Sequence, residues 1–363
     1  MVKIKLGYVI DFKNGKSVKK SDGIIPIYGG NGILGYTDKS NFSHTIVVGR
    51  VGAYCGSIHV EENSCWVSDN AIAGVPKEGQ DLTYLYYVLK SLNLNSKQIG
   101  SSQPLITQSM LKDMVVDIEI DIEKQKKIAN SISIIDQKIQ INNQINQELE
   151  AMAKTLYDYW FVQFDFPDQN GKPYKSSGGK LIYNPELKRE IPEGWGVKKV
   201  GELHIATGKR DANFGTENGQ YDFWTTANSP IKADEFSFEG KAILIAGNGN
   251  FYVNFTEGKF EAYQRTYVIQ SEDENMLIFM YMACLQSVEK LRKGSNGSII
   301  KYITIGDVNN IASPYNKKVV NEFVRIYSPL IDLISKNKRQ NQELTQLRDW
   351  LLPMLMNGQV KVE

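Results

Sequence analysis

The feature that most constrains the fold of this chain is an internal duplication. Five segments of the first half match segments of the second half, and the offset between matched residues stays between 194 and 197. The matched pairs are 5–11 with 199–205, 27–32 with 223–228, 45–52 with 242–249, 105–116 with 302–313, and Asn146–Leu149 with Asn341–Leu344. A steady period of this kind is the sequence signature of a tandem repeat. We therefore expect two similar units whose interiors have diverged.

Each half contains the same series of local patterns. Short β-branched runs such as 44–49 and 241–247, bounded by Gly/Asn-rich turns, predict strands. One helical pattern follows in each half, at 81–93 and at 274–293, and each half ends in a long helix. The expected fold class is α+β, with two similar α/β domains joined by a pair of long antiparallel coiled-coil helices in a pseudo-two-fold tandem repeat.

The two long helices are expected at about 123–161 and 320–356, each with apolar residues at three- and four-residue spacing. Both apolar seams turn polar near their middle, and isolated polar residues in a coiled coil fix its register. We expect the helices to pair with each other; the alternative is that each packs on its own domain core. The expected packing positions are Ile128, Ile132, Ile135, Ile139, Ile145, Leu149, Met152, Leu156, Ile326, Leu330, Leu333, Leu344, Leu347 and Leu351.

Changes of pattern along the chain predict five parts. In order, they are an α/β domain at 1–119, a long helix at 120–163, a connector rich in Pro, Gly, Ser and Lys at 164–195, a second α/β domain at 196–316, and a second long helix with a C-terminal tail at 317–363.

The composition of the chain excludes several classes of protein. With 363 residues, 42% hydrophobic and 23% charged, it is typical of a soluble protein of two or three domains. It has neither an apolar run long enough to span a bilayer nor an N-terminus typical of a secretory signal. Its three cysteines show no CxxC spacing, which favours the reducing cytoplasm. A net charge of +1 argues against a protein that grips nucleic acid alone through phosphates.

Four phrases give the chain a resemblance to a known family. They are "LEAMAKTLYDYWFVQFDFP" at 149–167, "NGKPYKSSGGK" at 170–180, "IPEGWGVKKVGEL" at 191–203 and "NQELTQLRDWLLPMLMNGQVKV" at 341–362. Together with the duplication, they resemble the specificity subunits of Type I restriction–modification enzymes, which act in phage defence. The resemblance covers essentially the whole chain.

The resemblance implies a non-catalytic DNA-recognition subunit. Each α/β domain would be a target recognition domain that reads one half of a bipartite site in double-stranded DNA. The helices would set the spacing of the half-sites and dock two modification subunits. S-adenosylmethionine would belong to those methyltransferase subunits, and ATP and Mg to restriction subunits where these are present.

The motifs that resemble catalytic sites are incomplete. The glycine pair in "AILIAGNGNF" at 242–251 lacks the third glycine of a dinucleotide loop, since Tyr252 stands there. "SPYN" at 313–316 lacks the second proline of an adenine methyltransferase motif, and we interpret it as the breaker before the second long helix. "EGK" occurs twice without a clear partner Asp, and His44, His59 and His204 show no metal-ligand spacing. We expect no catalytic residue, metal ligand or cofactor in this chain.

Base reading needs amide and guanidinium groups on loops that can enter a groove. In the first half the candidates are Tyr28, Asn31, Arg50, Tyr54, Asn70, Ser101, Ser102 and Gln103, with Lys13, Lys16, Lys19 and Lys20 for phosphates. In the second half they are Lys209, Arg210, Asn213, Trp224, Asn228, Asn248, Asn250, Gln264, Arg265, Lys293, Ser295 and Asn296. Two other functions remain open: a self-contained adenine DNA methyltransferase, and a coiled-coil scaffold without a DNA function.

Overall fold

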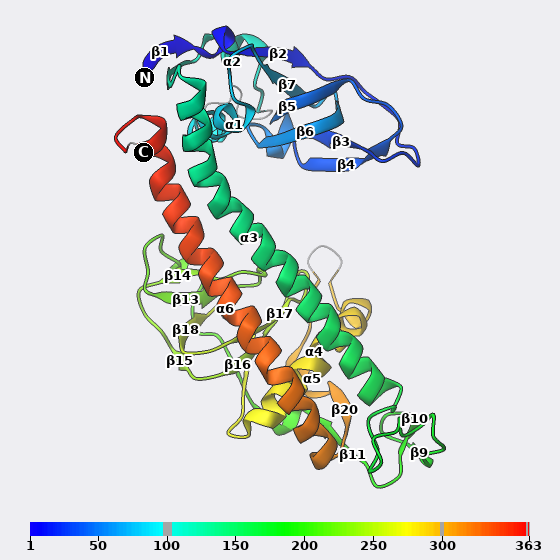
Figure 1. The fold of residues 1–363 in the computed structure, drawn as a ribbon. Helices are drawn as coiled ribbons and strands as arrows, with labels where there is room; N and C mark the ends of the chain where they lie inside the picture. The colour runs from blue at the N-terminus through cyan, green and yellow to red at the C-terminus, as the bar shows by residue number, and fades with distance from the viewer. Residues whose placement is uncertain (97–103, 298–300, 361, 363) are drawn as a thin grey trace. The chain divides into compact units, whose positions relative to one another are not determined.

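The structure is a computed structural model that describes residues 1–96, 104–297, 301–360 and 362 (Figure 1). The chain forms two compact units: unit 1 is Met1–Asn143 with Arg339–Glu363, and unit 2 is Gln144–Lys338. Each unit therefore holds one α/β domain and about half of each long helix, α3 (Ile122–Tyr157) and α6 (Lys317–Met356). A π-helical turn extends α3 to Val162.

The α/β domain of unit 1 is built on a six-stranded sheet with the order β2-β7-β5-β6-β3-β4. β3 and β6 run parallel, and the other neighbours run antiparallel. A separate antiparallel pair, β1 with β8, joins the start of the domain to its end. The bounds are β1 (Val2–Lys5), β2 (Ile10–Asn14), β3 (Ile25–Gly29), β4 (Gly32–Thr37), β5 (Phe42–Gly49), β6 (Ile58–Val67), β7 (Ala71–Pro76) and β8 (Val115–Ile118).

Unit 2 contains two four-stranded sheets, with the orders β12-β19-β16-β17 and β14-β13-β18-β15. Two antiparallel pairs, β9 with β10 and β11 with β20, complete it. The bounds are β9 (Leu181–Asn184), β10 (Arg189–Pro192), β11 (Gly196–Lys199), β12 (His204–Thr207), β13 (Tyr221–Trp224), β14 (Ile231–Ala233), β15 (Phe238–Glu239), β16 (Ala242–Ala246), β17 (Val253–Thr256), β18 (Lys259–Ala262), β19 (Thr266–Gln270) and β20 (Ala312–Tyr315).

The two halves repeat one topology, as the duplication predicted. The strand order β2-β7-β5-β6 in unit 1 recurs as β12-β19-β16-β17 in unit 2, and the pair β1–β8 recurs as β11–β20. The helices correspond too: α1 (Leu82–Ser91) with α4 (Glu274–Gly294), and α2 (Gln108–Asp113) with α5 (Ile305–Asn309). Equivalent residue types start them, because Asp81 and Asp273 cap α1 and α4 while Thr107 and Thr304 cap α2 and α5.

Two segments differ from the expectation. The motif at 313–316 is not simply a helix breaker, because Ser313–Tyr315 belongs to β20 and pairs with β11; only then does α6 begin. The connector at 164–195 is folded rather than extended. Its Phe166 and Tyr174 rings stack at 4.8 Å, and Phe164 and Trp195 are buried in the core of unit 2. The aromatic residues in this stretch outweigh its Pro, Gly and Ser content.

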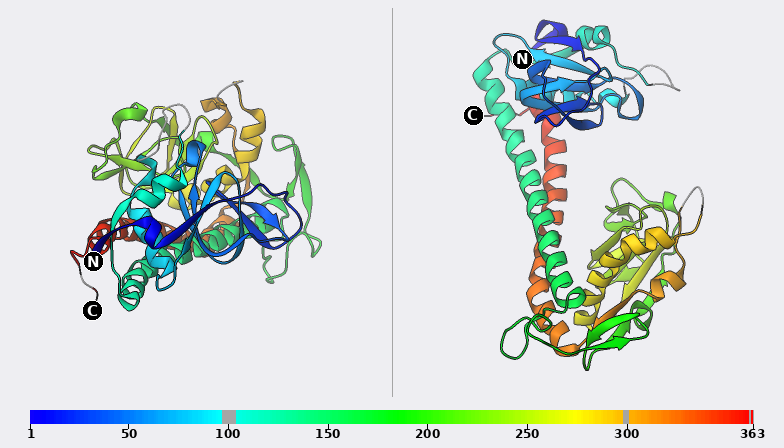
Figure 2. Two further views of the ribbon diagram at one scale, coloured as in Figure 1. Left: turned by 90° about the horizontal axis from the view of Figure 1, so that it is seen from above. Right: turned by 90° about the vertical axis from the view of Figure 1, so that its right-hand side faces the viewer.

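Segments of α3 and α6 run side by side in each unit, and their direction is antiparallel (Figures 1 and 2). In unit 1, Arg348 Nη1 donates to Asp136 Oδ1 at 2.9 Å, and Asn142 Nδ2 donates to Asn341 Oδ1 at 2.8 Å. In unit 2, Asn337 Nδ2 donates to Asn146 Oδ1 at 2.9 Å. As the residue number rises along α3 it falls along α6, which confirms the predicted antiparallel pair.

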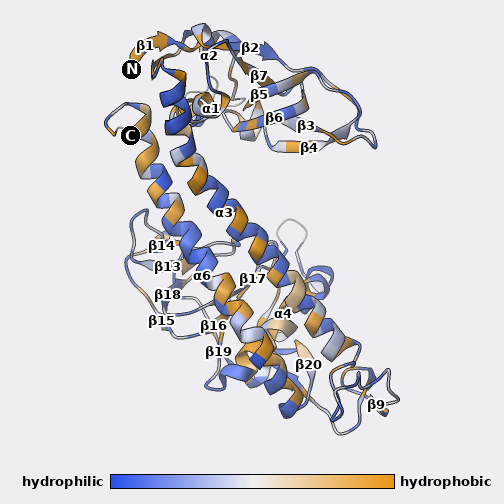
Figure 3. Ribbon diagram, in the orientation of Figure 1, coloured by the Kyte–Doolittle hydropathy of each residue, from blue (hydrophilic) through white to orange (hydrophobic). Residues whose placement is uncertain are grey.

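Part of the predicted helix seam is wrong. The expected positions that the structure leaves exposed are Ile145 (39%), Met152 (59%), Ile326 (44%), Leu333 (41%) and Leu347 (44%). Ile128, Ile132 and Ile135 are buried as expected. The remaining positions, Ile139, Leu149, Leu156, Leu330, Leu344 and Leu351, are half-buried. Both helices carry apolar residues on more than one face, so spacing alone does not select the face that packs (Figure 3).

The buried seam is completed by residues that the spacing did not single out. Asn142 and Asn146 of α3 are buried, as are Ala153, Tyr157 and, on α6, Asn337. The asparagines occupy the seam because each finds an amide partner on the other helix. The helices also pack on their own domain cores, so the two alternatives for their packing hold together.

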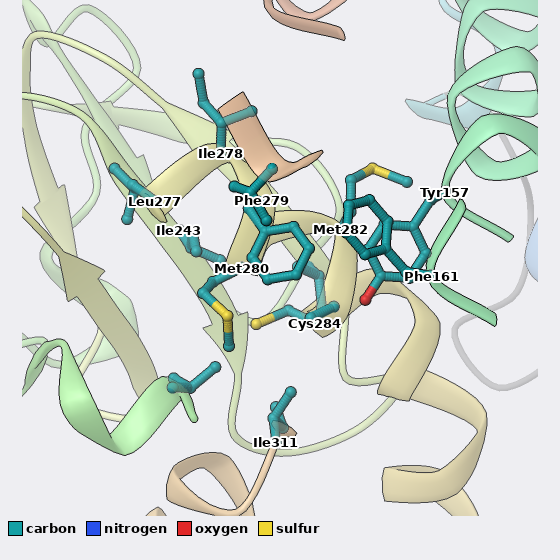
Figure 4. Packing of buried hydrophobic residues seen from close by; sticks show 14 of the residues in the cluster. Tyr157, Phe161, Ile243, Leu277, Ile278, Phe279, Met280, Met282, Cys284 and Ile311 are labelled. Atoms are coloured by element: carbon teal, nitrogen blue, oxygen red, sulfur yellow. The ribbon is translucent and has the colours of Figure 1, made fainter. Parts of the chain in front are cut away.

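The core of unit 2 shows how a helix end is fixed to its domain. Tyr157 and Phe161, at the end of α3, lie against Phe279 of α4, with ring centroids 6.1 and 4.8 Å away (Figure 4). The Tyr157 hydroxyl is 2.7 Å from Ser313 Oγ of β20, so this buried polar group has a partner. Within the described part of the chain, no helix is both long enough and apolar enough to cross a membrane.

Candidate nucleic-acid interface

In unit 1, four turns meet at one end of the six-stranded sheet. We call residues 30–31, 50–57, 68–70 and 104–106 loop cluster 1. Arg50 N donates to Asn70 O at 3.0 Å, and Ile106 N donates to Arg50 O at 3.0 Å. Ser57 Oγ donates to the carbonyl of Gly30, which fixes the β3–β4 turn to the same group. Backbone hydrogen bonds thus hold the turns together without using the outward side chains.

In unit 2, residues 209–210, 224–228, 247–250, 263–265 and 296–303 come together in the same way, and we call them loop cluster 2 (298–300 lie outside the described residues). Gly247 N donates to Arg265 O at 2.7 Å, and Ile303 N donates to Gly247 O at 2.9 Å. Gln264 N donates to Arg210 O at 2.9 Å, which adds the segment that follows β12.

The two loop clusters are built on equivalent residues. Gly247 takes the place of Arg50 in the repeat, Arg265 that of Asn70, and Ile303 that of Ile106, so the same two backbone hydrogen bonds recur. The frame of the cluster is therefore duplicated, while the side chains on it differ. Such an arrangement holds two different sets of side chains on one kind of rigid support.

Several predicted DNA-binding residues lie on these clusters with side chains free to meet a ligand. In loop cluster 1, Asn31, Tyr54 and Asn70 are exposed, and Arg50 is half-buried. In loop cluster 2 the exposed residues are Lys209, Asn228, Asn250, Gln264, Arg265 and Asn296, and Asn248 is half-buried. Amide and guanidinium groups of this kind form bidentate hydrogen bonds with base edges.

Three predicted residues have partners inside the protein instead. Tyr28 is buried, and its hydroxyl donates to Glu61 Oε2 at 3.1 Å; burial, with the Glu61 charge, raises the pKa of Tyr28 to about 12. Trp224 is buried and its Nε1 donates to Thr256 Oγ1 at 3.2 Å. Both side chains point into a sheet core, so the structure contradicts their assignment as base readers.

Arg210 is the third such residue. It pairs with Glu235 at 2.5 Å and with the fully buried Glu261 at 3.3 Å, and its guanidinium lies 4.3 Å from the centre of the Phe214 ring. A guanidinium held by two carboxylates and an aromatic ring has few free donors, so we assign it the structural role of neutralising Glu261.

The predicted phosphate-binding lysines lie near loop cluster 1, on β2 and on the loop that follows it. Lys16 N donates to Val67 O at 3.0 Å, which attaches this loop to the turn at 68–70. Lys16, Lys19 and Lys20 are exposed, whereas Lys13 pairs with Asp11 at 2.9 Å.

The remaining candidates are divided in the same way. Asn213 and Lys293 are exposed, and Ser295 Oγ donates to Arg292 O at 2.8 Å. The Gly/Ser-loop candidates Ser101, Ser102 and Gln103 lie outside the described residues.

Two residues of the clusters were missed by sequence reasoning. His59 Nε2 is 3.2 Å from Gly30 O in loop cluster 1, and Arg292 Nη2 donates to Asn250 O at 3.4 Å in loop cluster 2. The signal for Arg292 was its place directly before the candidate loop "KGSNGS". His59 was considered only as a metal ligand.

The chemistry of the rest of the described chain is consistent with a recognition role. The three cysteines are free and buried, and burial raises the pKa of the Cys284 thiol. Among the described residues there is no group of three or more His, Cys, Asp or Glu side chains placed to hold a metal ion.

Comparison with known proteins decides the family. A profile of the Type I restriction modification DNA specificity domain matches residues 1–151 and 192–346. The chain belongs to this family. It is 29% identical over 322 residues to the Type I restriction enzyme MjaIX specificity subunit of Methanocaldococcus jannaschii, covering 80% of this chain and 71% of that one.

Other members of the family agree. The chain is 34% identical over 186 residues to the EcoDI specificity subunit of Escherichia coli, covering 48% of this chain and 40% of that one. The crystal structure of the Type I restriction–modification S subunit from M. genitalium matches with a TM-score of 0.64 at 18% identity, covering 98% of this chain and 96% of that one. The last match shows that the fold is shared.

Proposed function

We propose that this specificity subunit reads a bipartite DNA site, one half with each α/β domain. The observation that carries the proposal is the repeated loop cluster: the same backbone frame occurs in both units, with different amide and guanidinium side chains on it. Half-sites of different sequence call for such a pair of supports. The chain is the DNA-recognition part of its enzyme, not a catalytic part.

The spacer role of the helices follows from their continuity. α3 has 36 residues and α6 has 40, and each contributes to both units. At about 1.5 Å per residue, helices of this length are suited to hold two reading domains about one turn of DNA (about 34 Å) apart. A coiled-coil scaffold without a DNA function would not need repeated loop clusters.

We propose two modification subunits as the protein partners, with restriction subunits joining in a nuclease-competent complex in the cytoplasm. The exposed apolar residues of the long helices support this docking. On α3 they include Ile134, Ile141, Ile145 and Met152, and on α6 they include Ile326, Leu333, Leu347 and Trp350. S-adenosylmethionine would then be held by the modification subunits, and ATP and Mg by the restriction subunits.

The net charge of +1 fits this division of labour. Phosphate contacts dominate the affinity of a protein for DNA, and a nearly neutral chain supplies few of them. The partner subunits would provide the rest, while this chain provides base contacts.

The proposal is tested with the chain and its modification subunit expressed together, by sequencing the methylated genome. We expect a split motif. Arg265→Ala should relax or abolish the reading of one base in the half read by unit 2, because a bidentate arginine contact contributes about 1–3 kcal/mol of discrimination. Arg325→Ala removes an exposed arginine from α6 in the same unit and should leave the motif unchanged. A continuous motif, or no motif at all, would contradict the proposal.

A further inference from the structure

Unit 2 contains a cavity of about 360 Å³ where β17 and α4 meet the unit-2 segments of α3 and α6. Aromatic and branched side chains form its walls, among them Phe255, Tyr281, Ile331 and Ile334. The Phe255 and Tyr281 rings lie 5.4 Å apart, centroid to centroid. Sites for small organic molecules have volumes of about 300–1,000 Å³ and apolar walls of this kind.

Two phenol groups line this cavity without a partner in the protein. Tyr327 is only 2% exposed and Tyr281 is half-buried, and neither hydroxyl forms a hydrogen bond with another side chain in the described part of the chain. Burial raises the pKa of both phenols, and the Glu150 charge adds to the shift, so both remain protonated donors. A buried hydroxyl without a partner is costly, and a ligand that accepts its hydrogen bond gains that energy.

The charges at the mouth of the cavity favour an anion. Three basic residues line it, Lys154, Arg292 and Lys338, against one acidic residue, Glu150. Lys338 is 3.7 Å from Glu150, and both side chains are more than half exposed, so this ion pair is weak. Lys338 is therefore able to turn towards a bound anion.

The repeat shows that this cavity is a property of the second half. Ile331 and Ala153 of unit 2 correspond to Asp136 and Arg348 of unit 1. In unit 1 these two residues form an ion pair, and Tyr87 donates to the same aspartate, so polar side chains fill the equivalent place. In unit 2, the small Ala153 and the apolar Ile331 leave a space with apolar walls.

We propose that this cavity binds a planar aromatic ring that bears an anionic group, such as an aryl phosphate or a mononucleotide. The ring packs against Phe255, Tyr281 and Ile331. The Tyr281 and Tyr327 hydroxyls donate to polar atoms of the ring, and the anionic group meets Lys338 at the mouth. The site is separate from DNA reading, because none of these residues belongs to loop cluster 2.

The proposal is tested on the full chain by calorimetry and ligand-observed NMR with four probes. Phenyl phosphate and adenosine monophosphate carry both ring and charge, phenol carries the ring alone, and inorganic phosphate the charge alone. We expect saturable one-to-one binding of the first two, about two- to fivefold tighter than phenol, since exposed charge pairs contribute modestly. Tighter binding of the nucleotide than of phenyl phosphate identifies a nucleotide site, and the reverse order a simpler aryl anion. Equal affinity for phenol, or equal affinity for inorganic phosphate, overturns the proposal.

Variants locate the site. Ser335 lines the cavity on α6, and Ser335→Trp should fill the space and abolish binding. Gln346→Trp places the same ring on an exposed position of α6 away from the cavity and should bind as the parent chain does. Lys338→Gln should weaken phenyl phosphate, but not phenol, about two- to fivefold. Unchanged binding by Ser335→Trp overturns the proposal; should that variant not fold by circular dichroism, the Lys338→Gln comparison decides in the same way.

Discussion

At the scale of single residues, Asp136 carries the strongest electrostatic role in unit 1. It accepts hydrogen bonds from Arg348 and Tyr87, both at 2.9 Å, and pairs with Lys90 at 3.6 Å, so it links α3 to α1 and α6. Burial alone would raise the pKa of Asp136. The hydrogen bond from Arg348, the charge of Lys90 and the Tyr87 hydroxyl outweigh burial and hold that pKa below its ordinary value of 3.8.

We therefore predict that Asp136→Asn lowers the free energy of unfolding at pH 7 by about 3 kcal/mol, because it leaves Arg348 partly buried without its carboxylate. An aspartate with a lowered pKa stabilises the fold above its unfolded pKa, and this contribution disappears as the pH falls below 3.8 through the folded pKa. The difference between parent and variant should thus shrink on acidification. Urea unfolding at pH 7 and below pH 4 measures it. Asp349→Asn removes the exposed second carboxylate of Arg348 and should cost less than about 1 kcal/mol.

At the scale of elements, the pairing of α3 with α6 depends on two asparagine pairs. Asn337 donates to Asn146 in unit 2, and Asn142 donates to Asn341 in unit 1. A slip of one helix by one turn would preserve at most one of these pairs, and a slip of two turns would preserve neither. Paired amides thus specify the register at some cost in stability.

We predict that Asn337→Leu alone destabilises the protein by about 1–3 kcal/mol, because the buried amide of Asn146 then has no partner. Adding Asn146→Leu should recover most of this loss, since an apolar pair replaces an amide pair of similar shape. Thermal or chemical unfolding of both single variants and the double variant gives the coupling energy. Additive effects in this cycle would show that the two amides do not depend on each other.

The same element shows where sequence reasoning reached its limit. The repeat period predicted the strand order, the cap residues and the antiparallel helices, because each leaves a local or periodic trace. The packing face of the helices was partly wrong, because Ile145 and Met152 are as apolar as Leu149, and only the tertiary partners decide which of them is buried. In the same way, an exposed and a buried tyrosine, Tyr54 and Tyr28, look alike in sequence.

At the scale of the whole molecule, the two loop clusters should read DNA independently. Asn70 and Arg265 occupy equivalent places in the two frames. We predict that Asn70→Ala changes the methylated motif only in one half and Arg265→Ala only in the other, each by about 10- to 100-fold at one base. In the double variant both halves should change, and the two free-energy effects should add. Methylated-genome sequencing of the three variants checks this; a change in both halves from one substitution would contradict it.

The two asparagine pairs also describe the ancestry of the molecule. Asn142 contacts Asn341 while Asn146 contacts Asn337, and the repeat relates one pair to the other with the helices exchanged. That is the pattern of an isologous interface, in which one contact is made twice across a two-fold axis. Before duplication, a single mutation would have altered both copies at once. After it, each copy became free to change alone, and the ion pair Asp136–Arg348 opposite the apolar Ile331 and Ala153 records one such change.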